Sequence, residues 1–400
     1  MGIKAPVTGG WMKSSAMAIS YLGKDIELAV ATLYGTQYRK DIINGITYYC
    51  IPFNIYDLKY NKAVEEEWKR VAEDFVPDIV HIHGTEFPHG LAYMKANGTR
   101  NVVVSIQGLV GAYARYSLGG LTHNVLRKYS TLYDVLKGHI LKMPERMERN
   151  GRCEMETISL AQHVIGRTDW DRVHVWAINP NTQYHFCNET LRTPFYSACW
   201  NLDECERHTI FLSQAHKPIK GIHKMVEAMP FILRHYPDTK VYVAGGDFML
   251  KNTWKDRLKF DAYANYVSHL MDKLEVKNRF VFTGLLDENQ MVQRFKKAHV
   301  FVCPSSIENS PNSLGEAQLV GTPCVASYVG GVPNMLTHEH TGLVYRFEEH
   351  EMLAAAVCRI LGDDDLAKSL SDNERTIAGK RHDPQLNAQK TIEIYKSIIK

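Results

Sequence analysis

The sequence predicts an α/β protein of two Rossmann-like domains, each built on a parallel sheet, that face each other across a cleft. Three observations support this fold class. The chain has 400 residues, a length typical of two or three domains. Short β-branched runs alternate with helical stretches, as in βαβ units. The alternation occurs twice, and neither half repeats the sequence of the other.

The first alternating series begins after Asp25. It predicts strands over 26–32 and 46–51, a helix over 62–75, and strands over 79–83 and 101–106. A helical and basic region is expected over 124–158, then a short strand over 163–166 and a loop-rich stretch with Pro180 and Pro194. We therefore expect an N-terminal domain over residues 1–200.

The second series predicts strands over 209–213, 240–244, 280–282, 300–303, 324–326 and 342–345, with an amphipathic helix over 222–235. We place the C-terminal domain at 201–383 and a final helix at 384–400. A doubly wound domain normally opens with an apolar strand that feeds a glycine turn. Only MGIKAPVT precedes Gly9 and Gly10, so the first strand is apparently missing: either the true start lies upstream or the domain lacks a central strand.

Composition excludes several classes of protein. With 45% hydrophobic and 23% charged residues, the chain is not disordered, collagen-like or coiled-coil. The net charge of +3 argues against nucleic acid as a partner. Basic residues concentrate between Gly108 and Arg152, eight of them against three acidic residues. This region suits a solvated helix face, an anionic lipid surface or a lipid-linked acceptor.

Cysteine spacing and the absence of targeting signals point to one compartment. The eight cysteines form no CxxC pair, and no signal peptide opens the sequence. The longest nearly apolar stretch, 101–114, is too short to span a bilayer. We expect a reduced, cytoplasmic protein, with a peripheral contact to the cytoplasmic membrane face as one role of the basic region. The sequons at Asn97 and Asn188 are then accidental.

The strongest motif is SIENSPNSLGEA over 306–317, which follows the strand ending at Cys303. It reads as a helix start, with Ser310 as the cap and Pro311 in the first helical position. The free N–H groups of Asn312, Ser313 and Leu314 would then point toward an anion. Glu308 and Glu316 bracket this site, and carboxylates accept hydrogen bonds from sugar hydroxyls. The alternative is a capped surface helix with solvated glutamates.

At this motif the sequence resembles the retaining GT-B glycosyltransferases of family 4 (glycosyl transferases group 1), of the polysaccharide-biosynthesis type. The two glutamates match the family's pair with seven intervening residues. FLSQAHKPIKG over 211–221 resembles its phosphate-binding loop, Gly330-Gly331-Val332-Pro333 its glycine loop, and DIVHIHG over 78–84 its cleft strand. In order and spacing the resemblance covers nearly the whole chain.

The resemblance implies roles for residues of the second domain. Glu316 would hold the ribose hydroxyls, Glu308 the donor sugar, and the backbone of 312–314 the diphosphate. Lys220 matches the family lysine, and main-chain contacts to the base would come from Gly284 and Leu285. The final helix would cross back to the first domain.

The second domain departs from the family at one cation. Where the family usually has an arginine, this chain has Gln214, which donates hydrogen bonds without charge. Lys217 would supply the missing charge; its alternative is a solvated loop lysine.

The first domain holds further candidates. By resemblance His83 would face donor and acceptor, and Gln107 stands where many relatives carry a histidine. In a retaining front-face reaction the leaving phosphate takes the acceptor proton, so the loss of that base does not abolish activity. Gly10 suits a tight loop close to the ligand. Arg167 would meet an anion; its alternative is a surface ion pair with Asp169 or Asp171.

His81 and His83 alternate onto one face of their strand, with Glu86 and His89 just beyond. A metal site there and a buried, hydrogen-bonded His81 are both open, while the resemblance implies a metal-independent enzyme.

We expect a hexosyltransferase that needs no cofactor, with a UDP- or GDP-sugar as donor and a saccharide or lipid-linked saccharide as acceptor. A GT-B nucleotide-sugar epimerase and a non-catalytic GT-B partner subunit are the alternatives.

Overall fold

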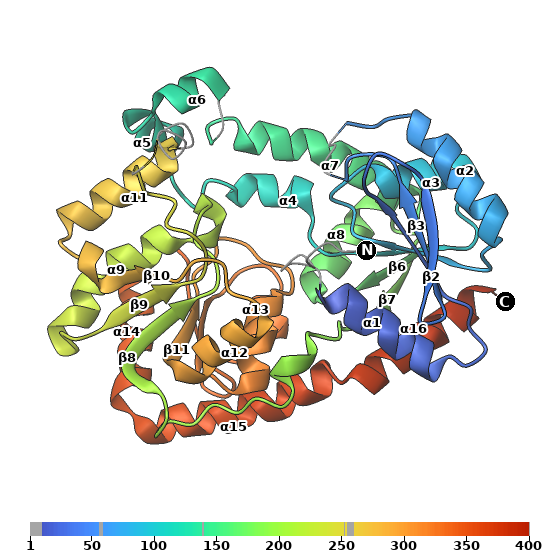
Figure 1. Cartoon of the computed structure of the whole chain (residues 1–400). Helices are drawn as coiled ribbons and strands as arrows, with labels where there is room; N and C mark the ends of the chain where they lie inside the picture. The colour runs from blue at the N-terminus through green and yellow to red at the C-terminus, as the bar shows by residue number, and fades with distance from the viewer. Residues whose placement is uncertain (1–9, 56–58, 138–139, 252, 254–259, 400) are drawn as a thin grey trace. The chain divides into compact units, whose positions relative to one another are not determined.

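The computed structural model describes residues 10–55, 59–137, 140–251, 253 and 260–399 (Figure 1). Among these residues the chain divides into two compact units. The N-unit comprises 10–113, 146–190 and 382–399, and the C-unit comprises 114–145 and 191–381. Each unit is therefore assembled from separated segments of the chain, whereas the sequence predicts one boundary near residue 200.

The N-unit contains a parallel sheet of four strands in the order β4-β5-β6-β7. The strands are β4 (Val80–His83), β5 (Val102–Ser105), β6 (His163–Gly166) and β7 (Gln183–Phe186). β5 is buried along its whole length, as expected for a β-branched run inside a parallel sheet. Parallel strands end at one edge of the sheet, so the residues that follow β4 to β7 gather there.

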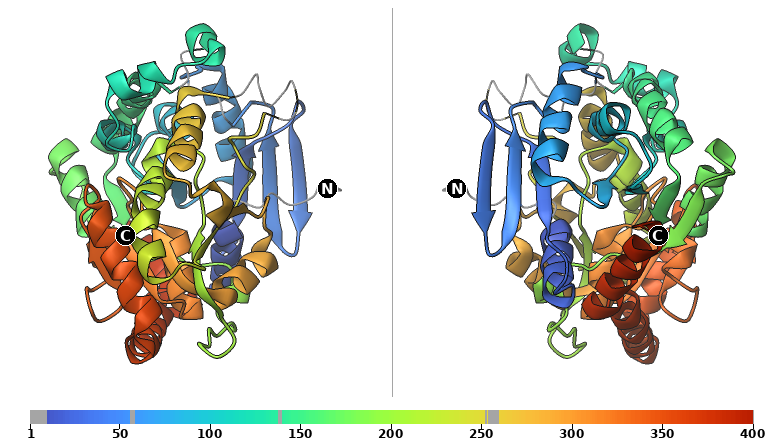
Figure 2. Two further views of the ribbon diagram at one scale, coloured as in Figure 1. Left: turned by 90° about the vertical axis from the view of Figure 1, so that its left-hand side faces the viewer. Right: turned by 90° about the vertical axis from the view of Figure 1, so that its right-hand side faces the viewer.

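A three-stranded sheet forms the other strand layer of the N-unit, in the order β1-β3-β2. It consists of β1 (Ala29–Leu33), β2 (Arg39–Ile43) and β3 (Ile46–Ile51), drawn as a group of blue arrows in Figure 2. Asn44 and Gly45, with φ of 51° and 78°, turn β2 back onto β3 as a type I′ hairpin. Among the described residues, no strand of this sheet pairs with a strand of the four-stranded sheet. Residues 1–9, on which the expected first strand would fall, lie outside the described residues.

Helices pack around the strands of the N-unit. They are α1 (Gly10–Leu22), α2 (Ala63–Phe75), α3 (His89–Asn97), α4 (Val110–Tyr113), α7 (Met143–Leu160), α8 (Asp169–Ile178) and α16 (Pro384–Ile399). α1 and α16 lie against each other and share a core with β5 and β6 through Ile19, Val103 and Ile394. The final helix thus completes the core of the N-unit.

The C-unit is built on a six-stranded parallel sheet in the order β10-β9-β8-β11-β12-β13. Its strands are β8 (Glu206–Leu212), β9 (Lys240–Val243), β10 (Phe280–Phe282), β11 (Ala298–Cys303), β12 (Cys324–Ser327) and β13 (Leu343–Tyr345). The chain leaves β8 toward one edge of the sheet and returns at β11 toward the other. β8 and β11 therefore flank the topological switch point, where doubly wound sheets bind ligands.

The helices of the C-unit include two that the sequence predicts for the first domain. Its helices are α5 (His123–Lys128), α6 (Leu132–Lys137), α9 (Ile222–His235), α11 (Ala262–Lys273), α12 (Glu288–Lys297), α13 (Asn312–Val320), α14 (His350–Gly362) and α15 (Asp364–Arg381). Figure 1 shows α5 and α6 beside α11, and contacts join α5 to α11. Residues 114–145 thus pack with the C-unit.

Hydrogen bonds explain why residues 114–145 belong to the C-unit. The buried side chain of His223 lies 2.9 Å from the Gly119 carbonyl oxygen through its Nε2. Thr131 Oγ1 donates to the Phe260 carbonyl oxygen at 2.7 Å. Asn265 Nδ2 donates to the Tyr129 carbonyl oxygen at 2.9 Å. The two residues of each pair are far apart in the sequence. A local hydrophobic pattern therefore cannot predict these hydrogen bonds.

The structure gives two findings on points that the sequence raises, membrane-spanning helices and the state of the cysteines. Within the described residues, every helix is too short or too polar to cross a membrane. All eight cysteines lie in the described part of the chain, and all are free.

A carboxyl group is buried in the core of the C-unit. Glu374 on α15 has no exposed surface, and the Cys324 thiol is the polar side chain beside its carboxyl group among the described residues. Burial raises the pKa of Glu374 well above its usual value, and the adjacent Cys324 thiol opposes this only in part. The folded chain therefore favours the protonated, neutral form of this side chain.

Replacing Glu374 by Gln is expected to remove a pH dependence of stability. The pKa of Glu374 is higher in the folded chain than in the unfolded one, so its stabilising contribution is complete below about pH 4. That contribution is lost as pH rises through the folded-state pKa, by at most about 1.4 kcal/mol per pH unit. Urea unfolding at a series of pH values should show a steeper alkaline decline for the wild type than for Glu374→Gln.

The exposed Glu348 provides the matched control for this measurement. Glu348→Gln should keep the wild-type slope. Equal slopes for the wild type and Glu374→Gln would show that Glu374 is ionised in the folded chain.

Candidate functional site

The first site lies in the C-unit, where loops follow β8 and β11. Residues 213–221 connect β8 to α9, and residues 304–311 connect β11 to α13. β11 is buried along its whole length, so its end is fixed by the core. Both loops contain residues that the sequence singles out, and the topological switch point brings them together.

Lys220 and Glu308 form a partly buried ion pair between these two loops. Lys220 Nζ donates to Glu308 Oε1 at 2.6 Å, and Ser305 Oγ donates to the same oxygen at 2.7 Å. The Glu308 side chain is 10% exposed and the Lys220 side chain 27%. Burial alone would lower the pKa of Lys220, but the Glu308 carboxylate outweighs it and the pKa is raised. The lysine is therefore a fixed cation.

Two glycines allow the loops to approach this ion pair closely. Gly221 has φ of 70°, and a Cβ atom there would collide with the Pro304 carbonyl oxygen. Gly330 has φ of 51°, and a Cβ atom there would collide with the Glu308 carbonyl oxygen. That same oxygen accepts a hydrogen bond from Gly331 N at 2.9 Å. The expected glycine loop thus fixes the backbone of Glu308.

Helix α13 begins one residue later than the sequence predicts. Pro311, with ψ of 117°, occupies the N-cap position, and Ser310 Oγ donates to Met335 Sδ at 3.5 Å instead of capping the helix. The Pro311 carbonyl oxygen accepts from Leu314 N at 3.0 Å, so the expectation of a free Leu314 N–H is wrong. Within the described residues, the N–H groups of Asn312 and Ser313 remain available to a ligand.

Glu316 lies on the second turn of α13 and is paired with a residue that the sequence did not indicate. Arg192 Nε donates to Glu316 Oε1 at 2.6 Å, and Arg192 Nη2 donates to Oε2 at 2.7 Å. The Glu316 side chain is 4% exposed. Burial raises the pKa of Glu316, and the Arg192 guanidinium opposes this shift.

The other C-unit candidates lie on exposed loops. Gln214 and Lys217 are exposed in the loop after β8. Gly284 pairs with Gly245 through two backbone hydrogen bonds of 2.9 and 3.1 Å, so its polar backbone groups are occupied. Leu285 is 83% exposed, and the described residues show no hydrogen bond to its backbone. A main-chain contact to a ligand can therefore come from Leu285 more readily than from Gly284.

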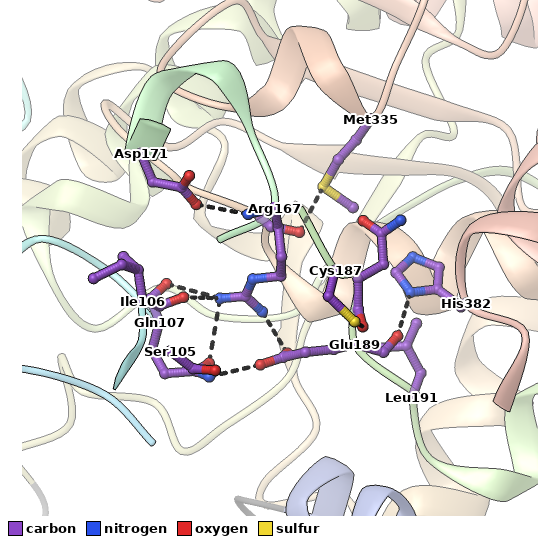
Figure 3. Close-up of polar contacts among 12 residues, drawn as sticks. Ser105, Ile106, Gln107, Arg167, Asp171, Cys187, Glu189, Leu191, Met335 and His382 are labelled. Atoms are coloured by element: carbon purple, nitrogen blue, oxygen red, sulfur yellow. Dashed lines mark hydrogen bonds and ion pairs between the residues drawn. The ribbon is translucent and has the colours of Figure 1, made fainter. Parts of the chain in front are cut away.

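The second site lies in the N-unit, at the carboxyl edge of β4 to β7. Arg167, Gln107 and Glu189 meet there, as Figure 3 shows. Arg167 Nη1 pairs with Glu189 Oε2 at 2.5 Å, and Gln107 Nε2 donates to Glu189 Oε1 at 2.7 Å. Arg167 Nη2 also donates to the carbonyl oxygens of Ile106 and Gln107 at 2.8 and 3.1 Å. The Arg167 side chain is 4% exposed, so this cation is held within the protein.

The expected alternative for Arg167, a surface ion pair with Asp169 or Asp171, is wrong. Asp169 pairs with Arg172 at 2.9 Å. Asp171 accepts from the backbone N of Arg167 at 3.0 Å and caps α8 together with Thr168. Thr168 and Asp171 thus form a capping box at the start of α8.

Two histidines of β4 lie beside this network. The rings of His81 and His83 stack with centroids 3.9 Å apart, so their predicted common face is confirmed. His81 Nδ1 lies 2.6 Å from Tyr395 Oη, and its Nε2 contacts Ser105 Oγ. Burial keeps the pKa of His81 well below its usual value, so the ring is neutral. His83 is exposed and lies edge-on to Trp11, 5.6 Å between centroids.

The remaining N-unit candidates are placed as follows. Gly10 is the first residue of α1, one position before Trp11. Trp11, His83, Gln107 and Arg167 line a hollow of about 40 Å³ that opens to solvent. His89 Nε2 lies 2.8 Å from the Ile55 carbonyl oxygen, so it does not join His81 and His83. The described residues hold no group of three or more His, Cys, Asp or Glu suited to a metal ion.

The sequence reasoning missed Arg192 and Glu189. Glu189 follows β7, as Gln107 follows β5 and Arg167 follows β6. Recognition of a strand over 183–186 would have placed it at the same sheet edge. No local signal indicates Arg192, because its partner lies 124 residues away.

The C-unit site combines two complementary kinds of group. Lys220 and the start of α13 favour an anion such as a phosphate. Glu308 and Glu316 are carboxylates that accept hydrogen bonds from hydroxyl groups. A ligand that carries both a phosphate and a sugar would use both kinds of group.

Residues 197–377 match the model of the family described as glycosyl transferases group 1. The matched segment is a little under half of the chain and lies within the C-unit. It does not include the other segment of the C-unit, residues 114–145. A curated relative, "Uncharacterized glycosyltransferase MJ1607" of Methanocaldococcus jannaschii, is 28% identical over 177 residues. That alignment covers 44% of this chain and 42% of the relative, so the chain spans less than half the length of this relative.

Solved structures resemble the whole chain. Sucrose-phosphate synthase from Thermosynechococcus elongatus superposes with a TM-score of 0.72 at 17% identity, covering 97% of this chain and 92% of that one. Anabaena Alr3699/HepE, in complex with UDP and glucose, gives a TM-score of 0.67 at 14% identity, covering 98% and 97%. These likenesses show the fold: an α/β chain of GT-B architecture with two Rossmann-like units.

Replacing Arg167 by Met is expected to destabilise the protein by about 3 to 5 kcal/mol, because the largely buried Glu189 is left as a charge without its countercharge. The double variant Arg167→Met/Glu189→Leu should recover part of this loss. The exposed pair of Arg172 with Asp169 gives the matched control, and Arg172→Met should cost at most about 1 kcal/mol. Urea unfolding measures all three; a loss for Arg167→Met no larger than the control would contradict the buried ion pair.

Proposed function

We propose that this chain is a retaining glycosyltransferase of family 4. It moves a sugar from a nucleotide-diphosphate sugar to a hydroxyl of a saccharide or lipid-linked saccharide, in cell-surface polysaccharide biosynthesis. The observation that carries the proposal is the Lys220–Glu308 pair beside the start of α13, at the switch point of the C-unit sheet. The group 1 family match over 197–377 supports it.

The C-unit would hold the donor. The N–H groups of Asn312 and Ser313 would bind the diphosphate, with Lys220 as a partly buried cation and Lys217 as an exposed one. Glu316 would accept hydrogen bonds from the ribose, and Glu308 from the donor sugar. UDP in the Anabaena structure supports a nucleoside diphosphate as the common part of the donor. A UDP- or GDP-sugar fits these contacts, with the base near Leu285.

Transfer with retention would proceed on the face from which the phosphate leaves. The bond from the anomeric carbon to the phosphate oxygen breaks, and the bond to the acceptor oxygen forms. The acceptor proton passes to the departing phosphate oxygen, so no side chain has to act as base. This agrees with Gln107 at the N-unit site, since an amide cannot take a proton at neutral pH. Lys220 and the start of α13 would stabilise the charge that develops on the diphosphate without a metal ion.

The N-unit would contribute to acceptor binding. Its hollow contains a cation that is already neutralised, because Arg167 pairs with Glu189. His83 lines the hollow and is exposed, so its ring can form hydrogen bonds with a ligand. Such a lining suits the hydroxyl groups of a saccharide.

One nucleoside diphosphate among UDP, GDP and ADP is expected to raise the melting temperature of the wild type. At a hundredfold excess over its Kd, binding to the folded state adds about 2.7 kcal/mol to stability. Glu316→Ala should lose most of the shift, because its carboxylate would hold the ribose. A thermal-shift panel measures this, with Glu351→Ala at an exposed position of α14 as the control.

The outcomes separate the proposal from its alternatives. A panel in which no diphosphate stabilises the wild type would contradict the donor site. Conversion of the bound donor without acceptor would point to an epimerase. Binding without any turnover of UDP- or GDP-sugars would point to a non-catalytic partner subunit.

A peripheral membrane contact would bring this enzyme to a lipid-linked acceptor, and α5 and α6 offer a surface for it. Leu132, Val135 and Leu136 share one face of α6 and are 81%, 76% and 80% exposed. The basic residues Arg127 and Lys128 are exposed at the end of α5. Exposed aliphatic side chains beside basic ones match the interface of an anionic bilayer.

The wild type is expected to bind vesicles that contain phosphatidylglycerol and not vesicles of phosphatidylcholine alone. Arg127→Gln/Lys128→Gln should weaken this binding by roughly thirtyfold, because each basic residue near the surface contributes about 1 kcal/mol. Leu132→Ser/Leu136→Ser should weaken it as well, since the apolar contact is removed. Vesicle flotation measures the bound fraction, with Leu386→Ser at an exposed position of α16 as the control. Equal binding to neutral and anionic vesicles would contradict the electrostatic contact.

A further inference from the structure

The guanidinium of Arg192 is fixed on both sides. One side forms the two hydrogen bonds to Glu316, of 2.6 and 2.7 Å. The other lies over the ring of Phe195, 4.7 Å from its centroid. Phe195 is fully buried and packs edge-on against Phe295, 5.9 Å between centroids. The core of the C-unit therefore sets the position of the arginine.

The pairing leaves part of the Glu316 carboxylate free. Each carboxylate oxygen has two lone pairs, and Arg192 occupies one on each. Two lone pairs remain, one per oxygen, in the plane that the guanidinium fork fixes. A vicinal diol presents two hydroxyl donors at a matching spacing. The ribose of a nucleotide contains one such diol.

The electrostatic surroundings of Glu316 depend on the same pair. Burial raises the pKa of Glu316, Arg192 lowers it, and Glu288 on α12 raises it further. Among the described residues, Arg192 and Glu288 are the charged groups that act on this carboxyl group. Without the guanidinium, the burial effect would be unopposed, and the protonated form would gain at neutral pH.

We propose that Arg192 is a positioning residue for nucleotide recognition: it holds the Glu316 carboxylate in one orientation, so that its two free lone pairs accept the 2′ and 3′ hydroxyls of the ribose. This rests on the proposed donor site. It assigns discrimination between ribonucleotides and deoxyribonucleotides to a pair of residues, one of which lies well outside the α13 motif. A site built to bind a hydroxyl rejects the analogue that lacks it.

Calorimetric titration of the wild type with UDP, GDP, ADP and their 2′-deoxy counterparts tests the proposal. The wild type should prefer the ribonucleotide by roughly ten- to a hundredfold, because a hydrogen bond to a charged group is lost with the hydroxyl. Arg192→Met should reduce this preference to a few-fold. Its affinity for the ribonucleotide should also rise more steeply with pH than that of the wild type, because the unpaired Glu316 ionises only as the pH increases.

Two further variants keep the test decisive. Arg192→Lys retains the charge without the two-pronged contact, so it should keep the pH profile of the wild type and lose part of the ribose preference. It also serves if Arg192→Met does not fold. Arg207→Met removes an arginine from an exposed ion pair with Asp364 in the same unit and should leave both readouts unchanged.

The outcomes distinguish this proposal from the proposed function. A wild type that binds no nucleotide would overturn both. Nucleotide binding that is lost in Glu316→Ala, together with an unchanged ribose preference in Arg192→Met, would overturn the role of Arg192 alone. Tighter binding in Arg192→Met would show that the arginine blocks the carboxylate, which also overturns it.

Discussion

The C-unit site depends on one ion pair, between the partly exposed Lys220 and the buried Glu308. The pair joins the loops that follow β8 and β11, the two strands at which the sheet changes direction. A buried charge without its partner is costly, so each loop is held by the other. Gly221 and Gly330 are needed because the backbones approach too closely for any side chain. The position of α13, and with it Glu316, follows from this junction.

Much of the fold could be predicted from the sequence, because its strands are short β-branched runs and its helices are amphipathic. Predicted strands over 46–51, 163–166 and 280–282 have the observed bounds, as does the helix over 222–235. The strand β2 was missed although Asn44-Gly45 is a strong hairpin signal. β7 was missed because Pro180 and Pro194 made its surroundings resemble a loop. Residues 114–145 were assigned to the first domain because sequence order does not reveal long-range hydrogen bonds.

The candidate site could be predicted where its residues form a local motif, and not where they pair across the chain. Glu308, Glu316 and Lys220 stand in recognisable loops, and the structure brings Lys220 and Glu308 together. The roles of these residues, and those of His83, Gln107, Gly10, Gln214 and Lys217, remain predictions. Arg192 and Glu189 are isolated polar residues in the sequence. Only burial turns them into the obligatory partners of Glu316 and Arg167.

The N-unit is made of three separated segments of the chain, and this limits when it can fold during synthesis. Residues 10–113 and 146–190 emerge from the ribosome before the C-unit is complete, yet their core also requires α16. Until Ile394 and Tyr395 arrive, the surfaces of Ile19, Val103 and Ile165 that they cover stay open to water. The C-unit, by contrast, has all its strands by residue 345. The unit to which the first described segment belongs therefore cannot complete its core until α16 has been made.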